Sequence, residues 1–251
     1  NISSKEVDIK ESCIQVFKDI GHKPFGLSLE NIENDLKALP NDAQDLVFEN
    51  VQARVRTLIL MSHGFVLGTG DMSELALGWC TYNGDHMSMY NVNCSVPKTL
   101  VKFLVQYVAN NLDVLNITCQ EAADVLGEIV NTIISPELLP AGKDGEIQQS
   151  TEEKLGAYEL HDFFLSNFVK YGFSPEKIFL MAETASFSKK YSSKEIKNAL
   201  NIFYRRFFDN QFKRNCVPDG PKVGSVSLSP RGDWRMPSEA SADLWIERIW
   251  L

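Results

Sequence analysis

The chain has 251 residues, 44% of them hydrophobic, which is enough to bury a sizeable core in one large domain or in a domain with a trailing extension. Its formal net charge of −8 argues against a broad surface for nucleic acid, and no apolar run reaches the roughly 18 residues of a membrane-spanning helix. Five cysteines without metal-ligand spacing are typical of reduced thiols in a cytoplasmic protein.

The first part of the chain predicts two helices and two strands. Residues 5–9 alternate weakly and predict a short parallel strand, which a helix follows over residues 10–20. Residues 21–42 are rich in Gly, Pro, Asn and Asp and predict an irregular excursion with one helical turn. A longer helix is expected from residue 43 to residue 61. The run GFVLGTG (64–70) then predicts a buried strand that ends in a glycine loop.

The second part is dominated by helices. Pro97 is well placed as the first residue of a helix, and apolar residues recur at helical spacing over residues 120–134. Ser192 and Glu195 predict a capping box at the start of another helix. Residues 135–156 between these helices predict a long polar loop.

These elements together predict a helix-rich α/β fold with few strands and a parallel sheet. The last part of the chain, residues 216–251, is expected to be an irregular tail, because residues 216–237 are rich in Gly, Pro and Ser. The sequence contains no internal repeat.

Residues 67–79, LGTGDMSELALGW, combine a strand end, a glycine turn and a helix start. In α/β folds this order of elements binds phosphate-bearing ligands, because free amides and the positive helix end point at the carboxyl edge of the sheet. On that interpretation Thr69 offers a hydroxyl and Glu74 offers a hard oxygen ligand for Mg²⁺. The structural alternative is that Asp71 and Glu74, three residues apart, form only a helix cap. The spacing leaves both open.

Lys98 is a second candidate site residue. It lies in the first turn of a predicted helix, where the helix dipole disfavours a cation by about 0.3–1 kcal/mol. An anion facing the ammonium would explain this position, and a solvated lysine that bears a small cost is the alternative. Asp85 in the sequence NGD is a third candidate, although Asn-Gly-Asp is ordinarily a turn. None of the four histidines is assigned a catalytic role.

The run LGTGDMSELALGWCTYNGDHMSMYNVNCSVPKTL (67–100) closely resembles the synthetase domain of glutamine-dependent NAD⁺ synthetases. The resemblance covers nearly the whole chain in long blocks that occur in order. The further blocks are FENVQARVRT (48–57), SPELLP (135–140), YELHDFFLSNFVKYGFSP (158–175), FYRRFFDNQFKRNCVPDGPKV (203–223) and LSPRGDWRMPS (228–238).

This resemblance implies a fold, a reaction and a set of site residues. The fold is the Rossmann-like, adenine-nucleotide-alpha-hydrolase-like fold of the ATP-pyrophosphatase group. The reaction uses ATP and Mg²⁺ to adenylate the nicotinate carboxylate of deamido-NAD⁺, after which ammonia displaces AMP. By position, Lys98 and Glu74 match the catalytic residues, and Glu74 also matches the metal ligand. The residues expected to contact ATP are Thr69, Lys98 and Ser135, and those expected to contact deamido-NAD⁺ are Asn50, Glu74, Trp79, Cys80, Thr81, Tyr82 and Lys213.

The chain departs from the family pattern in two ways. The pyrophosphate-binding loop of the form SGGxDS is absent from the 251 residues, and so is the glutaminase domain that supplies ammonia. In the family the loop lies upstream, so we expect residues 1–251 to be the C-terminal portion of the synthetase domain, truncated at its N-terminal strands and inactive alone. Sheet and helix flanks bared by such a truncation predict self-association as a homo-oligomer.

Two alternatives remain beside this interpretation. The chain could be a non-catalytic α/β interaction module that has lost the phosphate loop. Another ATP-pyrophosphatase, such as a GMP synthetase or a tRNA-modifying enzyme, is argued against by the runs SELALGW and FENVQAR.

Overall fold

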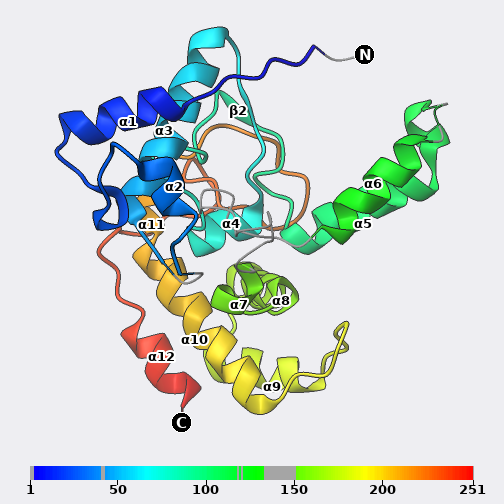
Figure 1. Ribbon diagram of the computed structural model, residues 1–251. Helices are drawn as coiled ribbons and strands as arrows, with labels where there is room; N and C mark the ends of the chain where they lie inside the picture. The colour runs from blue at the N-terminus through cyan, green and yellow to red at the C-terminus, as the bar shows by residue number, and fades with distance from the viewer. Residues whose placement is uncertain (1–2, 41–42, 118, 120, 133–150, 251) are drawn as a thin grey trace.

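The computed structural model describes residues 3–40, 43–117, 119, 121–132 and 151–250, and helices dominate it (Figure 1). The helices are α1 (Lys10–Asp19), α2 (Ile32–Leu36), α3 (Leu46–His63), α4 (Met72–Leu77), α5 (Lys98–Asn110), α6 (Glu121–Asn131), α7 (Thr151–Leu155), α8 (Tyr158–Tyr171), α9 (Pro175–Thr184), α10 (Ser193–Asp209), α11 (Gln211–Arg214) and α12 (Asp243–Ile249). Short 3₁₀ turns occur at Pro24–Gly26 and Leu112–Leu115. No helix within the described ranges is long and apolar enough to cross a membrane.

The sheet consists of two short parallel strands, β1 (Leu67–Gly68) and β2 (Tyr90–Asn91). Leu67 pairs with Tyr90 and Gly68 pairs with Asn91. A Cβ atom at Gly68 would overlap the Ser88 hydroxyl and lie 3.2 Å from Asn91 Cβ in β2, so a larger residue there would force the Ser88 side chain to move. The prediction of a helix-rich α/β fold with a parallel sheet is confirmed.

Two strand predictions were wrong in detail. Residues 5–9 form no strand, and Val7 is 42% exposed, although helix α1 follows at Lys10 as predicted. The run 64–70 contains only the two strand residues of β1, and its Phe65 is 73% exposed rather than buried. Both predictions used the local sequence pattern alone, and that pattern does not show whether a neighbouring strand is present to pair with the segment.

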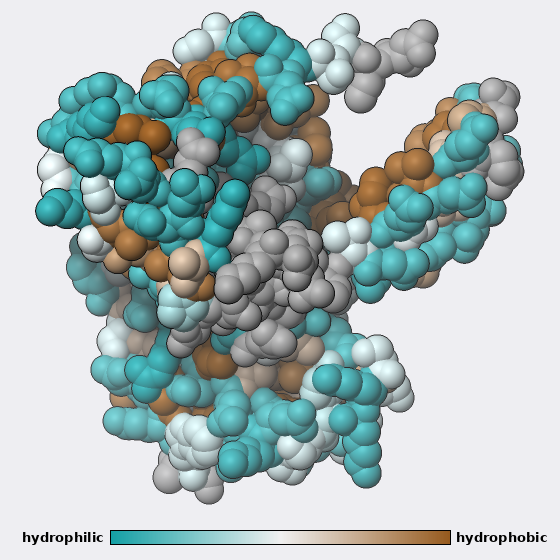
Figure 2. All heavy atoms as spheres, viewed as in Figure 1, coloured by the Kyte–Doolittle hydropathy of each residue, from teal (hydrophilic) through white to brown (hydrophobic). Residues whose placement is uncertain are grey.

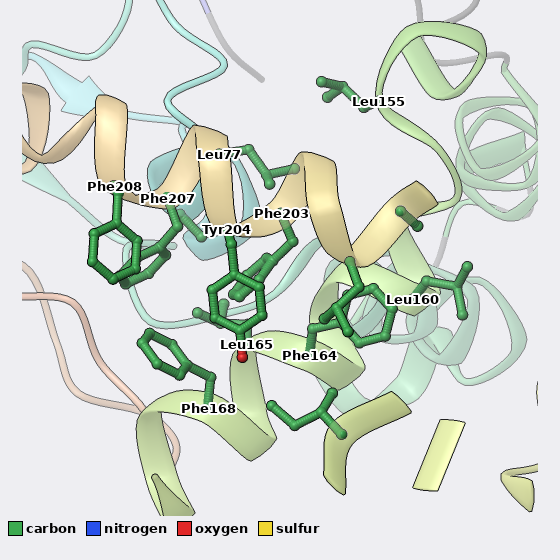
Figure 3. Packing of buried hydrophobic residues seen from close by; sticks show 14 of the residues in the cluster. Leu77, Leu155, Leu160, Phe164, Leu165, Phe168, Phe203, Tyr204, Phe207 and Phe208 are labelled. Carbon is green, nitrogen blue, oxygen red and sulfur yellow. The ribbon is translucent and has the colours of Figure 1, made fainter. Parts of the chain in front are cut away.

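The main core lies between α8 and α10 and is rich in aromatic side chains (Figure 3). Phe203 of α10 has its ring centroid 6.0 Å from that of Phe164 and 6.2 Å from that of Phe168, both in α8. The predicted capping box is present, since the Ser192 side chain accepts from Glu195 N while the Glu195 side chain accepts from Ser192 N. The core extends onto α4, α9 and α12, and α4 is thereby fixed against the body of the molecule.

A second, smaller cluster joins α1 to α3. Phe17 of α1 stacks on Phe48 of α3 with a centroid distance of 5.9 Å. Helix α3 begins at Leu46, three residues later than predicted, because Asp45 caps it by accepting from Val47 N and Phe48 N.

Helices α5 and α6 form a hairpin that projects from the body (Figure 1). Helix α5 begins at Lys98, so Pro97 is the residue before the helix rather than its first residue. Apolar side chains along the hairpin are exposed (Figure 2), including Phe103 at 64% and Ile129 at 56%.

Residues 215–242 contain no helix or strand, but they are packed rather than loose. Asp219 O accepts from Asn91 N at 2.7 Å, and Pro221 O accepts from Ser95 Oγ at 2.7 Å. A Cβ atom at Gly220 would overlap the backbone oxygen of Asn91. Residues 219–223 therefore form a strap across residues 91–95, and the short helix α12 ends this part of the chain.

Candidate functional site

The site is organised around the two ends of the six-residue helix α4. At the first end, Asp71 and Glu74 form a capping box. Asp71 Oδ1 accepts from Glu74 N at 2.9 Å, and Glu74 Oε2 accepts from Asp71 N at 3.0 Å. The helix cap proposed as the structural alternative is therefore real, and it leaves Asp71 Oδ2 and Glu74 Oε1 available for other partners.

Lys98 occupies both of those oxygens. Its Nζ atom lies 2.7 Å from Asp71 Oδ2 and 2.7 Å from Glu74 Oε1. The Lys98 side chain is only 20% exposed, so the alternative of a solvated lysine does not hold. The anions that face its ammonium are carboxylates of its own chain, which offset the unfavourable helix dipole at the start of α5.

Burial and charge shift the titration of this cluster. Burial raises the pKa of the Asp71 carboxyl, the charge of Glu74 adds to the rise, and the Lys98 ammonium opposes it. Burial disfavours the Lys98 ammonium, but the carboxylates of Asp71 and Glu74 outweigh it and raise the pKa of Lys98. The Tyr158 ring lies 5.5 Å from Lys98 Nζ, and its buried hydroxyl has no partner among the described residues. The two carboxylates and the Tyr158 ring therefore stabilise a positive charge at the position of Lys98 Nζ.

At the other end of α4, two arginine side chains bind the last carbonyl groups of the helix, and a lysine binds two carbonyl groups just beyond it. Arg214 donates to Leu75 O at 3.2 Å and to Ala76 O at 3.0 Å, and Arg206 donates to Leu77 O at 2.9 Å. These side chains from α10 and α11 add to the left-handed glycine cap of the helix, in which Trp79 N donates to Glu74 O at 2.9 Å.

Lys213 completes this set of cations. Its Nζ atom donates to Gly78 O and to Cys80 O, each at 2.8 Å. Gly78 has φ +60°, and a Cβ atom there would overlap the Asn210 side chain. The chain therefore leaves α4 through a left-handed glycine that packs directly on the end of α10.

The loop after α4 carries four of the predicted dinucleotide contacts. Trp79 packs beneath Arg206, whose Cζ atom is 5.1 Å from the ring centroid. Burial raises the pKa of the Cys80 thiol to about 12, so it is not a nucleophile. Tyr82 lies between His86 and Phe212, with centroid distances of 5.4 Å to each.

The remaining predicted residues lie at different places. Asn50 is on α3 in a groove against α1, and Arg54, one turn later, donates to Tyr82 O at 3.3 Å, which links α3 to the loop. Thr69 is exposed at the end of β1. Ser135 lies outside the described residues. Asp85 accepts from Thr81 N at 2.7 Å and so stabilises a turn.

Sequence reasoning missed several residues that build the site. Asp71 was considered only as a cap, and Ser73, Tyr158, Asp162 and Arg206 were not considered. Tyr158 and Asp162 lie in the block YELHDFF, which carried the resemblance without indicating a role for either. Nothing in local spacing could join Asp162 to Ser73, its hydrogen-bond partner 89 residues away.

The comparison with known families decides the membership of the chain. The family model described as NAD synthase matches residues 1–215. The chain belongs to the NAD synthase family. This member of the NAD synthase family is 42% identical over 273 residues to the glutamine-dependent NAD(+) synthetase of Mycobacterium leprae (strain TN), and the match covers 99% of this chain and 37% of the relative. It is 40% identical over 271 residues to the glutamine-dependent NAD(+) synthetase of Mycobacterium tuberculosis (strain ATCC 25618 / H37Rv), with the same coverage.

A solved structure supports the fold. The crystal structure of a glutamine-dependent NAD(+) synthetase from Cytophaga hutchinsonii is similar to the NAD synthase chain, with a TM-score of 0.62 at 19% identity. The match covers 98% of this chain and 40% of that structure. The chain therefore has the fold of this part of an NAD synthetase and spans a little over a third of the length of its relatives.

Proposed function

We propose that the protein containing this chain converts deamido-NAD⁺ to NAD⁺ in an ATP-dependent reaction. ATP adenylates the nicotinate carboxylate with release of pyrophosphate, and ammonia then attacks the acyl carbon and expels AMP. The observation that carries the proposal is the meeting of Lys98, Asp71 and Glu74 at the first end of α4, at 2.7 Å in each ion pair. The names of the relatives, glutamine-dependent NAD(+) synthetases, support the same reaction.

The first end of α4 is proposed to bind ATP. Lys98 supplies a cation whose side chain is half-buried, and its ammonium would stabilise charge that develops on the phosphate during adenylation. Thr69 on the exposed end of β1 and Ser135 are proposed as further ATP contacts. Binding of the phosphates would require Lys98 to exchange its carboxylate partners for phosphate oxygens.

The same carboxylates fit a magnesium ion. Mg²⁺ is commonly held by one or two carboxylates together with substrate phosphates and water. Glu74 and Asp71 present two carboxylate oxygens that already share one positive charge, Lys98 Nζ. When bound, Mg²⁺ would neutralise phosphate charge and so make the α-phosphate easier to attack.

The second end of α4 is proposed to bind deamido-NAD⁺. Trp79, Cys80, Thr81 and Tyr82 form one loop, and Lys213 fixes that loop through two carbonyl groups. Asn50 is proposed to contact the dinucleotide from α3, whose Arg54 donates to Tyr82 O of the same loop. Helix α4 is six residues long, or about 9 Å, so the two proposed subsites lie within the length of one dinucleotide.

We further propose that ammonia comes from a glutaminase domain of the full-length protein, and that the protein is a homo-oligomer. The 251 residues contain no SGGxDS loop, whose amides and aspartate would hold the ATP phosphates and Mg²⁺. We therefore expect the 251-residue chain alone to be inactive.

The test is an assay of NAD⁺ and AMP formation by the full-length protein with deamido-NAD⁺, ATP, Mg²⁺ and ammonium. Lys98→Met and Glu74→Gln are expected to lower kcat by about 100-fold or more, because each removes a charge from the proposed centre. The matched control is Lys222→Met, since Lys222 also forms an ion pair, with Asp233 at 2.6 Å, but on an exposed surface. Absence of NAD⁺ formation by the wild-type protein would refute the proposal and favour a non-catalytic interaction module.

A further inference from the structure

Asp162 of α8 joins the two helix ends that carry Glu74 and Lys98. Its Oδ1 atom accepts a short hydrogen bond from Ser73 Oγ in the first turn of α4. Its Oδ2 atom accepts from Thr99 N at 3.0 Å and from Thr99 Oγ1 at 2.7 Å, in the first turn of α5. One carboxylate therefore connects three helices that are far apart in the sequence.

A further hydrogen bond closes this network. Ser73 Oγ donates to Asp162 and accepts from Lys98 N at 2.8 Å, so the first two amide groups of α5 are both satisfied by side chains from elsewhere. Helix α5 needs this, because Pro97 before it provides no side-chain cap. The negative charge of Asp162 also lies at the positive end of α5, where it is stabilising.

The network sets the position of the two proposed catalytic groups. Glu74 directly follows Ser73 in the chain, and Lys98 directly precedes Thr99. Asp162 thus holds the neighbours of both residues without binding the Lys98 ammonium itself. The hairpin of α5 and α6, which projects from the body (Figure 1), begins at Lys98. The Asp162 carboxylate therefore also fixes the start of this hairpin through Thr99.

We propose that Asp162 is a positioning residue for adenylation, which holds Lys98 and Glu74 at the spacing that the phosphates and the metal require. The inference rests on the proposed function for its kinetic consequence but on the hydrogen-bond network for its geometry. A displacement of about 1 Å at a reacting group can cost about 100-fold in rate.

Glu159 offers a matched control on the same helix. Its carboxylate also accepts three hydrogen bonds from a distant segment, from Ser188 N, Ser188 Oγ and Tyr191 Oη. It touches neither α4 nor α5 through those bonds. Loss of Glu159 should therefore weaken the fold without moving Lys98.

The kinetic test compares Asp162→Ala with Glu159→Ala in the full-length protein. Asp162→Ala is expected to lower kcat by about 10- to 100-fold while the KM for ammonia is unchanged, because an outer residue that orients a catalytic group usually has an effect of that size. Glu159→Ala is expected to keep the wild-type kcat. Thr99→Val, which removes the hydroxyl that donates to Asp162, should lower kcat less than Asp162→Ala does. Thr99→Ser keeps a hydroxyl at this position and should have a kcat close to the wild-type value. Equal losses of kcat in Asp162→Ala and Glu159→Ala would overturn the inference.

A structural test separates this inference from the proposed function. In a crystal structure of Asp162→Ala, Lys98 Nζ is expected to leave one or both of Asp71 and Glu74, and in Glu159→Ala it is expected to stay. If Lys98 keeps both ion pairs without Asp162, the inference fails whatever the kinetics. If the wild-type protein forms no NAD⁺, the proposed function fails, and these distances still decide the role of Asp162. Where Asp162→Ala does not fold, Asp162→Asn replaces it, with a smaller displacement expected.

Discussion

Substitution of Gly78 by alanine tests how tightly the second end of α4 is packed. Gly78 has φ +60°, a conformation that costs a residue with a Cβ atom about 1–2 kcal/mol. The new Cβ atom would also overlap the Asn210 side chain, and overpacking of this kind costs about 1–3 kcal/mol. We therefore expect Gly78→Ala to lower the free energy of unfolding by about 2–5 kcal/mol.

Two other glycines separate these contributions. Gly172, at the end of α8, has φ +63° but open space around its Cα, so Gly172→Ala should cost only the conformational part, about 1–2 kcal/mol. Gly127 within α6 has open space and no positive φ, so Gly127→Ala should stabilise the protein by about 0.5–1 kcal/mol. Urea unfolding followed by far-UV circular dichroism measures all three.

The double variant Gly78→Ala with Asn210→Gly isolates the overlap, because the three atoms nearest to the new Cβ all belong to the Asn210 side chain. In the Asn210→Gly background, the cost of Gly78→Ala should fall to that of Gly172→Ala. The reasoning is refuted if Gly78→Ala and Gly172→Ala cost the same in the wild-type background, or if the double variant shows no coupling between the two positions.

Three further predictions follow from particular contacts. Burial lowers the pKa of His161 to about 4, so as the pH falls His161 is protonated in the unfolded state before it is protonated in the folded state. The free energy of unfolding should therefore fall by up to about 3 kcal/mol as the pH drops from 6.5 to 4, and His161→Gln should reduce this loss. Ser192→Ala removes one half of the capping box of α10 and should cost about 0.5–2 kcal/mol in urea unfolding, whereas Ser193→Ala should cost less. Gly220→Ala should displace the strap from Asn91 and speed tryptic cleavage after Lys222, and an unchanged cleavage rate would contradict the contact.

Local signals predicted the parts of the fold that depend on a few neighbouring residues. The start of α10 was predicted from Ser192 and Glu195, because a cap is a property of one segment. The strand at residues 5–9 was wrong because a strand is defined by a partner that its own sequence does not contain. The helices of the projecting hairpin were predicted, but their pattern could not reveal that residues such as Phe103 are exposed.

The candidate site was predicted in a similarly uneven way. Glu74 and Lys98 were both proposed, and the structure brings them together. However, the unfavourable position of Lys98 suggested a ligand anion, whereas Asp71 and Glu74 supply the negative charge. The cations at the far end of α4 come from residues 206–214, more than 100 positions later, so no spacing rule could have placed them there.

The double anchoring of α4 makes its length matter more than its composition. Each added residue in an α-helix advances the chain by about 1.5 Å and rotates it by about 100°. A single insertion or deletion within Met72–Leu77 would thus break either the ion pair between Glu74 and Lys98 or the hydrogen bonds from Arg214 to the last carbonyl groups of the helix. Exchanges of one apolar side chain for another leave the length of α4 unchanged. We therefore expect this helix to tolerate such substitutions but not insertions or deletions.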